Sequence, residues 1–185
     1  MYLDTFVSSV IEPGDVFLVY RGGLLQKIIN KAQSLMSRDG EARYAHAGFF
    51  TSNLGDTFEA RVRIGEYHIT DYIGCDVLFY KHMCMNNITF FKHYRGIKNK
   101  SDGKIYPFYR LAFYMMPFIN KWAPFDRGVC SEKVAQLYYL CEFMSYWKGV
   151  TPDYLHDMVC DPWANQWVVL YEGSFTEEIY CRLFV

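Results

Sequence analysis

The sequence predicts an α+β domain in which a small antiparallel sheet packs against helices, one of which begins at Cys130. Four patterns support this prediction. A short apolar run at 16–20 is typical of a buried strand, and the apolar residues of 24–36 recur with the period of an α-helix. Two strand-like segments, 44–50 and 57–63, flank a turn and predict a β-hairpin. After Cys130, apolar residues again recur at helical spacing.

Length and composition limit the class of protein. The 185 residues fit one domain, so we expect a single domain over 1–185. A net charge of −1 with 21% charged residues gives no sign of a nucleic-acid partner or of attraction to an anionic membrane. The six cysteines follow no repeated spacing, and neither a secretory signal nor an apolar run that could cross a bilayer is visible. We therefore expect a reduced, cytoplasmic protein.

The first elements follow from turn and periodicity signals. Pro13-Gly14-Asp15 predicts a turn before the strand at 16–20, and Gly22-Gly23 separates that strand from an amphipathic helix. Asp39-Gly40 is expected to end this helix. Its apolar face is formed by Leu24, Leu25, Ile28, Ile29, Ala32, Leu35 and Met36.

The hairpin makes a prediction about register. If its loop is centred between residues 53 and 54, Gly48 lies opposite Glu59 and His46 lies opposite Arg61. His46 and Glu59 then share one face as diagonal neighbours, roughly 7–8 Å apart at the backbone. Gly48 leaves room for the imidazole to reach the carboxylate, whereas a slip of one residue would put the two groups on opposite faces. The alternative is a histidine within the sheet and a glutamate that points to water.

Later elements are predicted from shorter signals. Asn87 starts a helix, and a further helix starts at Thr151-Pro152, with threonine as N-cap and proline at the first position. Apolar runs predict strands at 65–70, 76–80, 167–171 and 179–185.

The segment 107–125 has an unusual composition, with seven aromatic residues, two methionines and three prolines. Its prolines exclude one long helix and favour two short helical pieces. One interpretation is additional core. The other is an apolar wall or lid over a groove that takes an acyl chain or the edge of a membrane.

Cys130, His46 and Glu59 together are the parts of a nucleophilic thiol site. A cysteine at the start of a helix benefits from the helix dipole and from unpaired backbone N–H groups, which favour the thiolate and can bind an oxyanion. His46 would act as the base, and Glu59 would orient it. Tyr20 and Tyr106 are candidates for helping to hold the oxyanion, with a core or rim tyrosine as the alternative. For Cys130 the alternative is a buried structural cysteine.

Three segments carry a resemblance to a known family: Tyr44-Ala45-His46-Ala47-Gly48, Phe58-Glu59-Ala60 and Val129-Cys130-Ser131-Glu132. In this order they resemble the circularly permuted, YiiX/YebB-like branch of the NlpC/P60 superfamily of papain-like cysteine hydrolases. The resemblance also takes in Pro13-Gly14-Asp15 and Gly103-Lys104-Ile105-Tyr106. It departs from the family where Ile105 and Pro107 replace a proline and an aspartate, and where Lys133 replaces a leucine.

The resemblance implies a permuted papain-like fold and a Cys130–His46–Glu59 triad that hydrolyses or transfers an amide, thioester or ester carbonyl without a cofactor. Its substrate would be a peptide, another amide or a lipid. A cysteine peptidase or amidase, for example one that acts on a cell-wall peptide, is the first expectation. The rivals are a lipid acyltransferase or phospholipase, favoured by 107–125, and an inactive papain-like domain that binds a partner. The oligomeric state is left open.

Other constellations are weaker. His156 and Cys160 are four residues apart, and His82 and Cys84 flank a methionine, but neither pair has the second pair that a zinc site requires, so no metal is expected. Phosphate-binding glycine loops and a Gly-x-Ser-x-Gly elbow are missing. A set of cations is interpreted as solvated surface: Arg21, Lys27, Lys31, Arg38, Arg61 and Arg63.

Overall fold

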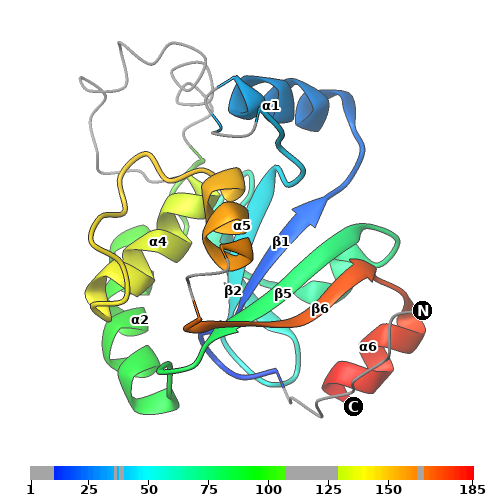
Figure 1. Ribbon diagram of the computed structural model, residues 1–185. Helices are drawn as coiled ribbons and strands as arrows, with labels where there is room; N and C mark the ends of the chain where they lie inside the picture. Colours follow the sequence, from blue (N-terminus) through cyan, green and yellow to red (C-terminus); the bar gives the residue numbers. More distant parts are fainter. Residues whose placement is uncertain (1–10, 36, 38–39, 107–128, 162–164) are drawn as a thin grey trace.

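A six-stranded antiparallel sheet with the strand order β4-β3-β2-β1-β5-β6 forms the centre of the fold (Figure 1). The computed structural model describes residues 11–35, 37, 40–106, 129–161 and 165–185. The strands are β1 (Val16–Tyr20), β2 (His46–Phe50), β3 (Asp56–Ala60), β4 (Ile64–His68), β5 (Asp76–His82) and β6 (Trp167–Ser174). The helices are α1 (Leu24–Ser34), α2 (Asn87–Ser101), α4 (Cys130–Leu140), α5 (Pro152–Cys160) and α6 (Glu177–Phe184), with a 3-10 turn η1 (Ile69–Tyr72).

Both faces of the sheet are covered, so its central strands are apolar on both sides. In β1, Val16 and Leu18 pack into the cluster that contains residues of α2, α4 and α5. Phe17 and Val19 pack into a second cluster with residues of η1 and α6. Figure 1 shows α2 and α4 together on one side of the sheet and α6 on the opposite side. This arrangement confirms the predicted α+β class, with an antiparallel sheet packed against the helix that begins at Cys130.

The hairpin register is the one predicted from its loop. Strands β2 and β3 pair with Gly48 opposite Glu59 and Phe49 opposite Phe58. The predicted start of α5 is also confirmed, because the Thr151 side chain accepts a hydrogen bond from the backbone N–H of Tyr154. In both places the local sequence is sufficient to predict the observed geometry.

One predicted strand, 179–185, is wrong. These residues belong to helix α6, which starts after Thr176, whose side chain accepts a hydrogen bond from the N–H of Ile179. Glu177 and Glu178 lie in the first turn, where negative charge stabilises a helix. Phe184 is buried against the sheet at helical spacing from Tyr180, and the two rings stack. The cap and this packing outweigh the strand preference of a short apolar run.

The predicted helical pieces and apolar wall of 107–125 lie outside the described residues. Among the described residues, none of the helices is both long and apolar enough to cross a lipid bilayer.

Asp15 makes the stability of the fold depend on pH. The side chain is only 2% exposed, and burial raises its pKa from 3.8 to about 7, although it accepts a hydrogen bond from the N–H of Glu12. Because the folded state holds this proton more tightly than the unfolded state, the contribution of Asp15 to stability is fully present below pH 4 and is lost as the pH rises to about 7. The loss should amount to roughly 2–4 kcal/mol.

The variant Asp15→Asn keeps an acceptor for the Glu12 N–H but carries no titrating group. Urea unfolding at pH 5 and pH 8 is therefore expected to show a smaller loss of stability with rising pH in the variant than in the wild type. Parallel stability curves for the two proteins would contradict this assignment.

Candidate active site

Cys130 is the first residue of α4, and the surrounding contacts fix the start of this helix. The side chain of Glu132 accepts hydrogen bonds from the N–H of Val129 at 3.0 Å and from the N–H of Gly149 at 2.8 Å. The hydroxyl of Ser131 donates to the carbonyl of Val150 at 2.6 Å, and Lys133 Nζ donates to Ser101 Oγ at 2.8 Å. The first turn is thereby tied to α2 and to the loop before α5. These contacts hold the thiol where α4 crosses β2.

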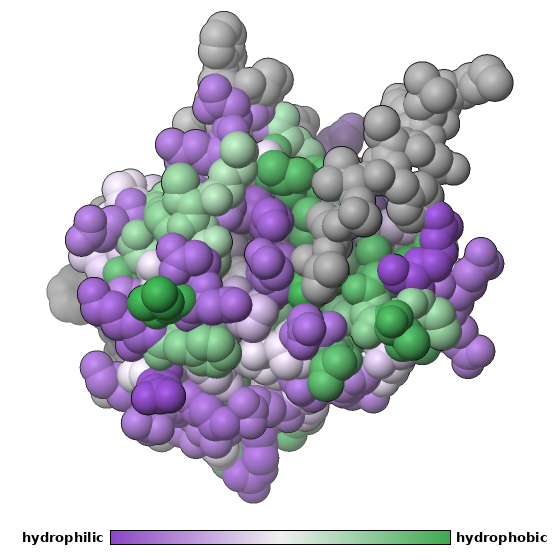
Figure 2. Space-filling model, turned by 90° about the horizontal axis from the view of Figure 1, so that it is seen from below, coloured by the Kyte–Doolittle hydropathy of each residue, from purple (hydrophilic) through white to green (hydrophobic). Residues whose placement is uncertain are grey.

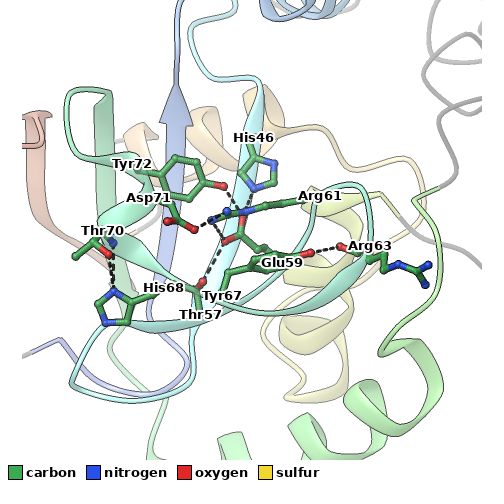
Figure 3. Close-up of polar contacts among 10 residues, drawn as sticks. All are labelled: His46, Thr57, Glu59, Arg61, Arg63, Tyr67, His68, Thr70, Asp71 and Tyr72. Atoms are coloured by element: carbon green, nitrogen blue, oxygen red, sulfur yellow. Dashed lines mark hydrogen bonds and ion pairs between the residues drawn. The ribbon is translucent and has the colours of Figure 1, made fainter.

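His46 begins β2 and lies between the thiol and a buried carboxylate. Its Nε2 contacts Glu59 Oε2, as Figure 3 shows, and its imidazole lies close enough to the Cys130 side chain for each group to shift the pKa of the other. Since Nε2 is taken by Glu59, Nδ1 is the nitrogen available to the thiol. The structure therefore brings together all three residues that the sequence predicted: Cys130, His46 and Glu59.

Glu59 is fully buried, and both of its carboxylate oxygens have partners. Oε1 accepts from Arg61 at 2.8 Å and from the Thr57 hydroxyl at 3.1 Å. Oε2 accepts from the Tyr72 hydroxyl and contacts His46. Burying a carboxylate is costly unless its lone pairs are satisfied, and here four groups converge on it (Figure 3). The position of Glu59 is thus determined by side chains from three elements.

The electrostatics of the three groups favour a charged pair. Burial alone would raise the pKa of the Cys130 thiol, but the charge and hydrogen bond of His46 and the backbone N–H groups of Ala47 and Ser131 lower it overall. Burial alone would lower the pKa of His46, yet Cys130 and Glu59 raise it to about 10. Against the effect of burial, His46 and Arg61 lower the pKa of Glu59 to about 2. Near neutral pH the arrangement therefore supports a thiolate beside an imidazolium.

Gly48 is required by close packing between β1 and β3. A Cβ atom at this position would lie 2.4 Å from Phe17 Cζ and 2.9 Å from Glu59 Cβ. Gly48→Ala is expected to destabilise the fold by roughly 1–3 kcal/mol, because the buried ring and the Glu59 side chain have to move. Gly96→Ala in α2 is the matched control, since a Cβ there meets nothing within 4 Å. Urea unfolding of both variants tests this, and equal stabilities would contradict it.

The two candidate oxyanion tyrosines are associated with the core cluster that contains Cys130. Tyr20 ends β1 and packs against the core cluster that contains Cys130. Tyr106 is a buried member of the same cluster. Core packing is their observed role, and a role in binding an oxyanion stays a prediction.

Arg61 and Tyr72 are site residues that the sequence did not reveal. Arg61 was expected to be a solvated surface cation, but it bonds Glu59 and also pairs with Asp71 at 2.7 Å. Its guanidinium lies over the Tyr67 and Tyr72 rings, 4.2 and 4.8 Å from their centroids. The two-residue spacing from Glu59 along one strand face could have indicated Arg61. Tyr72 comes from η1, and no sequence signal connects it to Glu59.

The two His–Cys pairs considered for metal binding are not part of larger groups of metal-ligating side chains among the described residues. Cys160 Sγ lies 3.5 Å from His156 Nε2, and His82 Nε2 lies 3.2 Å from Gln166 Oε1. Within the described ranges, groups of three or more His, Cys, Asp or Glu side chains that could hold a metal ion are absent.

Comparison with known proteins identifies a similar fold but no function. No family model matches the sequence, and no curated protein matches it. Among solved structures, the chain is similar to the crystal structure of the metalloprotein yiiX (DUF1105) from Escherichia coli O157:H7. The TM-score is 0.52 at 15% sequence identity, and the match covers 94% of this chain and 93% of that chain. At this level of identity the likeness concerns architecture alone: the chain has a YiiX-like α+β fold.

Proposed function

We propose that this protein is a papain-like cysteine hydrolase that acts on an amide carbonyl. The observation that carries the proposal is the position of His46, whose imidazole bridges the Cys130 thiol and the buried Glu59 carboxylate. A nucleophile, its base and a group that orients the base are what covalent acyl transfer requires. The order of the three residues along the chain further supports the circularly permuted NlpC/P60 arrangement.

In the proposed reaction, the Cys130 thiolate attacks the carbonyl carbon and forms a C–S bond while the C=O π electrons move to oxygen. The backbone N–H of Cys130 at the start of α4 stabilises this oxyanion. When the intermediate collapses, the bond to the leaving nitrogen breaks and the His46 imidazolium gives that nitrogen its proton. His46 then takes a proton from water, which attacks the thioester, releases the acid and restores the thiolate. Glu59 stays ionised throughout and stabilises the imidazolium.

Although yiiX is described as a metalloprotein, the residues of this site do not suit a resident metal ion. Both oxygens of Glu59 accept hydrogen bonds from side-chain donors, and Nε2 of His46 is engaged with the same carboxylate. None of the proposed steps therefore uses a metal.

A side-by-side substrate panel tests the proposal. Short cell-wall peptides and phospholipids would each be incubated with the wild type and with Cys130→Ala, and both the products and any acyl adduct on the protein would be followed by mass spectrometry. We expect cleavage of an amide and an acyl adduct on Cys130 in the wild type alone. Release of fatty acid or transfer of an acyl chain would instead favour the lipid-directed enzyme. Equal turnover by Cys130→Ala would exclude Cys130 as the nucleophile.

A further inference from the structure

Helix α1, together with its C-cap Leu35, presents three apolar side chains to solvent and a polar side chain to the core. Leu24 is 78% exposed, Ile28 46% and Leu35 82%, whereas Gln33 is buried. The separations from residue 24 to residues 28 and 35 are close to one and three turns of a helix, so the three apolar residues lie on one face. A surface helix of a globular protein normally has the opposite orientation.

The inner side of α1 is held in place by polar contacts, so its outward face is fixed. Gln33 Nε2 donates to the carbonyl of Tyr44 at 3.1 Å, and its Oε1 accepts from the N–H of Asp153 at 3.1 Å. Asn30 Nδ2 donates to the carbonyl of Arg43 at 2.8 Å. Because all three backbone partners belong to other segments, rotating the helix to bury Leu24 and Leu35 would break these bonds.

The charged residues in and around α1 are basic. Lys27 and Lys31 are exposed on α1, and Lys31 lies two turns from Leu24 on the same face. Arg21 precedes the helix and is also exposed. The stretch from 16 to 38 contains no aspartate or glutamate, although the whole chain has a net charge of −1. Lysines beside leucines can extend their ammonium groups past the apolar surface toward anions.

Exposed apolar residues elsewhere include single residues in the turns between strands. Figure 2 shows a face on which hydrophilic residues predominate and hydrophobic residues are scattered among them. Leu54 and Val62, which are 62% and 68% exposed, lie in the turns between β2 and β3 and between β3 and β4. Isolated apolar residues are ordinary at a protein surface, whereas an aligned set with basic neighbours indicates an interaction surface.

We propose that the outer face of α1, formed by Leu24, Lys27, Ile28, Lys31 and Leu35, docks on an anionic lipid bilayer. The leucines and isoleucine would enter the boundary between head groups and acyl chains, and the lysines would contact the anionic head groups. Figure 1 shows α1 at the end of the sheet where β1 ends and β2 begins, which is also the end that carries His46. Docking would therefore bring the candidate active site next to the membrane.

Vesicle flotation tests this proposal with the full chain. Mixed phosphatidylcholine–phosphatidylserine vesicles are expected to bind the wild type, and pure phosphatidylcholine vesicles to bind it much more weakly. Leu24→Gln with Leu35→Gln should lower the partition coefficient at least about tenfold. Lys27→Gln with Lys31→Gln should lower it roughly tenfold on the anionic vesicles alone. The matched control, Leu54→Gln with Val62→Gln, removes two similarly exposed apolar residues from turns and should bind like the wild type.

Thermal melting would establish that each variant folds, and Cys130→Ala is expected to bind vesicles unchanged, so membrane docking is tested independently of catalysis. Absence of wild-type binding, or equal binding by wild type and the α1 variants, would overturn the proposal. A dimer that only the Leu24 and Leu35 substitutions dissociate, seen by light scattering, would also overturn it and assign the face to a second copy of the chain.

Discussion

Replacing His46 with alanine is expected to slow the alkylation of Cys130 by iodoacetamide at pH 7 by roughly tenfold or more. In the wild type the imidazole offsets burial and lowers the pKa of the thiol. Without it, burial and the helix N-terminus are left, and the thiolate becomes a minor species at neutral pH. Peptide mapping of the alkylated protein over time measures the rate at each cysteine separately.

The exposed cysteines serve as an internal reference in the same peptide maps. Cys84 and Cys181 are exposed, so their alkylation should be equal in the wild type and in His46→Ala. His93→Ala, which removes a half-buried imidazole from α2, serves as the matched control and should leave Cys130 as reactive as before. If Cys130 reacts at the same rate with and without His46, the imidazole does not activate it, and an inactive binding domain becomes the better account.

Glu59→Ala is expected to have the largest effect on stability, a loss of roughly 3–5 kcal/mol. The carboxylate is fully buried and is the common partner of Arg61, Tyr72 and His46. Removing it leaves a cation and a hydroxyl without their main acceptor in a site that is poorly hydrated. Urea unfolding at pH 7 gives the free energy of unfolding directly.

Two further variants distinguish the loss of the buried Glu59 carboxylate from the loss of an exposed ion pair. Glu59→Gln keeps an acceptor for Arg61 and should cost less than Glu59→Ala. Asp71→Ala also removes a carboxylate bound to Arg61, but its side chain is 54% exposed, so the cost should stay below about 1 kcal/mol. A similar small loss for Glu59→Ala and Asp71→Ala would show that the buried network contributes little.

The parts of the fold that could be predicted are those determined by short-range chemistry. The turn between β2 and β3 and the two-residue period of strands fix the pairing of Gly48 with Glu59. This pairing places His46 beside the carboxylate. Thr151 and Pro152 are likewise sufficient to start α5. The meeting of His46 with Cys130 could be proposed from residue types, but it depends on how α4 packs on the sheet.

Several of the features that were missed depend on contacts between elements that are distant in the sequence. Tyr72 reaches Glu59 from a 3-10 turn, and Arg61 turns toward the same carboxylate where exposure was expected. Helix α6 was predicted as a strand because its apolar run is short, while the deciding contact is the burial of Phe184 against the sheet. The outward apolar face of α1 was also beyond prediction, since the bonds of Gln33 to Tyr44 and Asp153 fix its orientation.

The titration of His46 in the wild type and in Cys130→Ala, followed by NMR with labelled histidine, tests the pairing of thiolate and imidazolium most directly. Because the thiolate contributes to raising the pKa of His46 to about 10, the wild-type ring should stay protonated through neutral pH. In Cys130→Ala the same ring should lose its proton at a clearly lower pH. A neutral His46 at pH 7 in the wild type, or identical titration curves for the two proteins, would contradict the proposed active site.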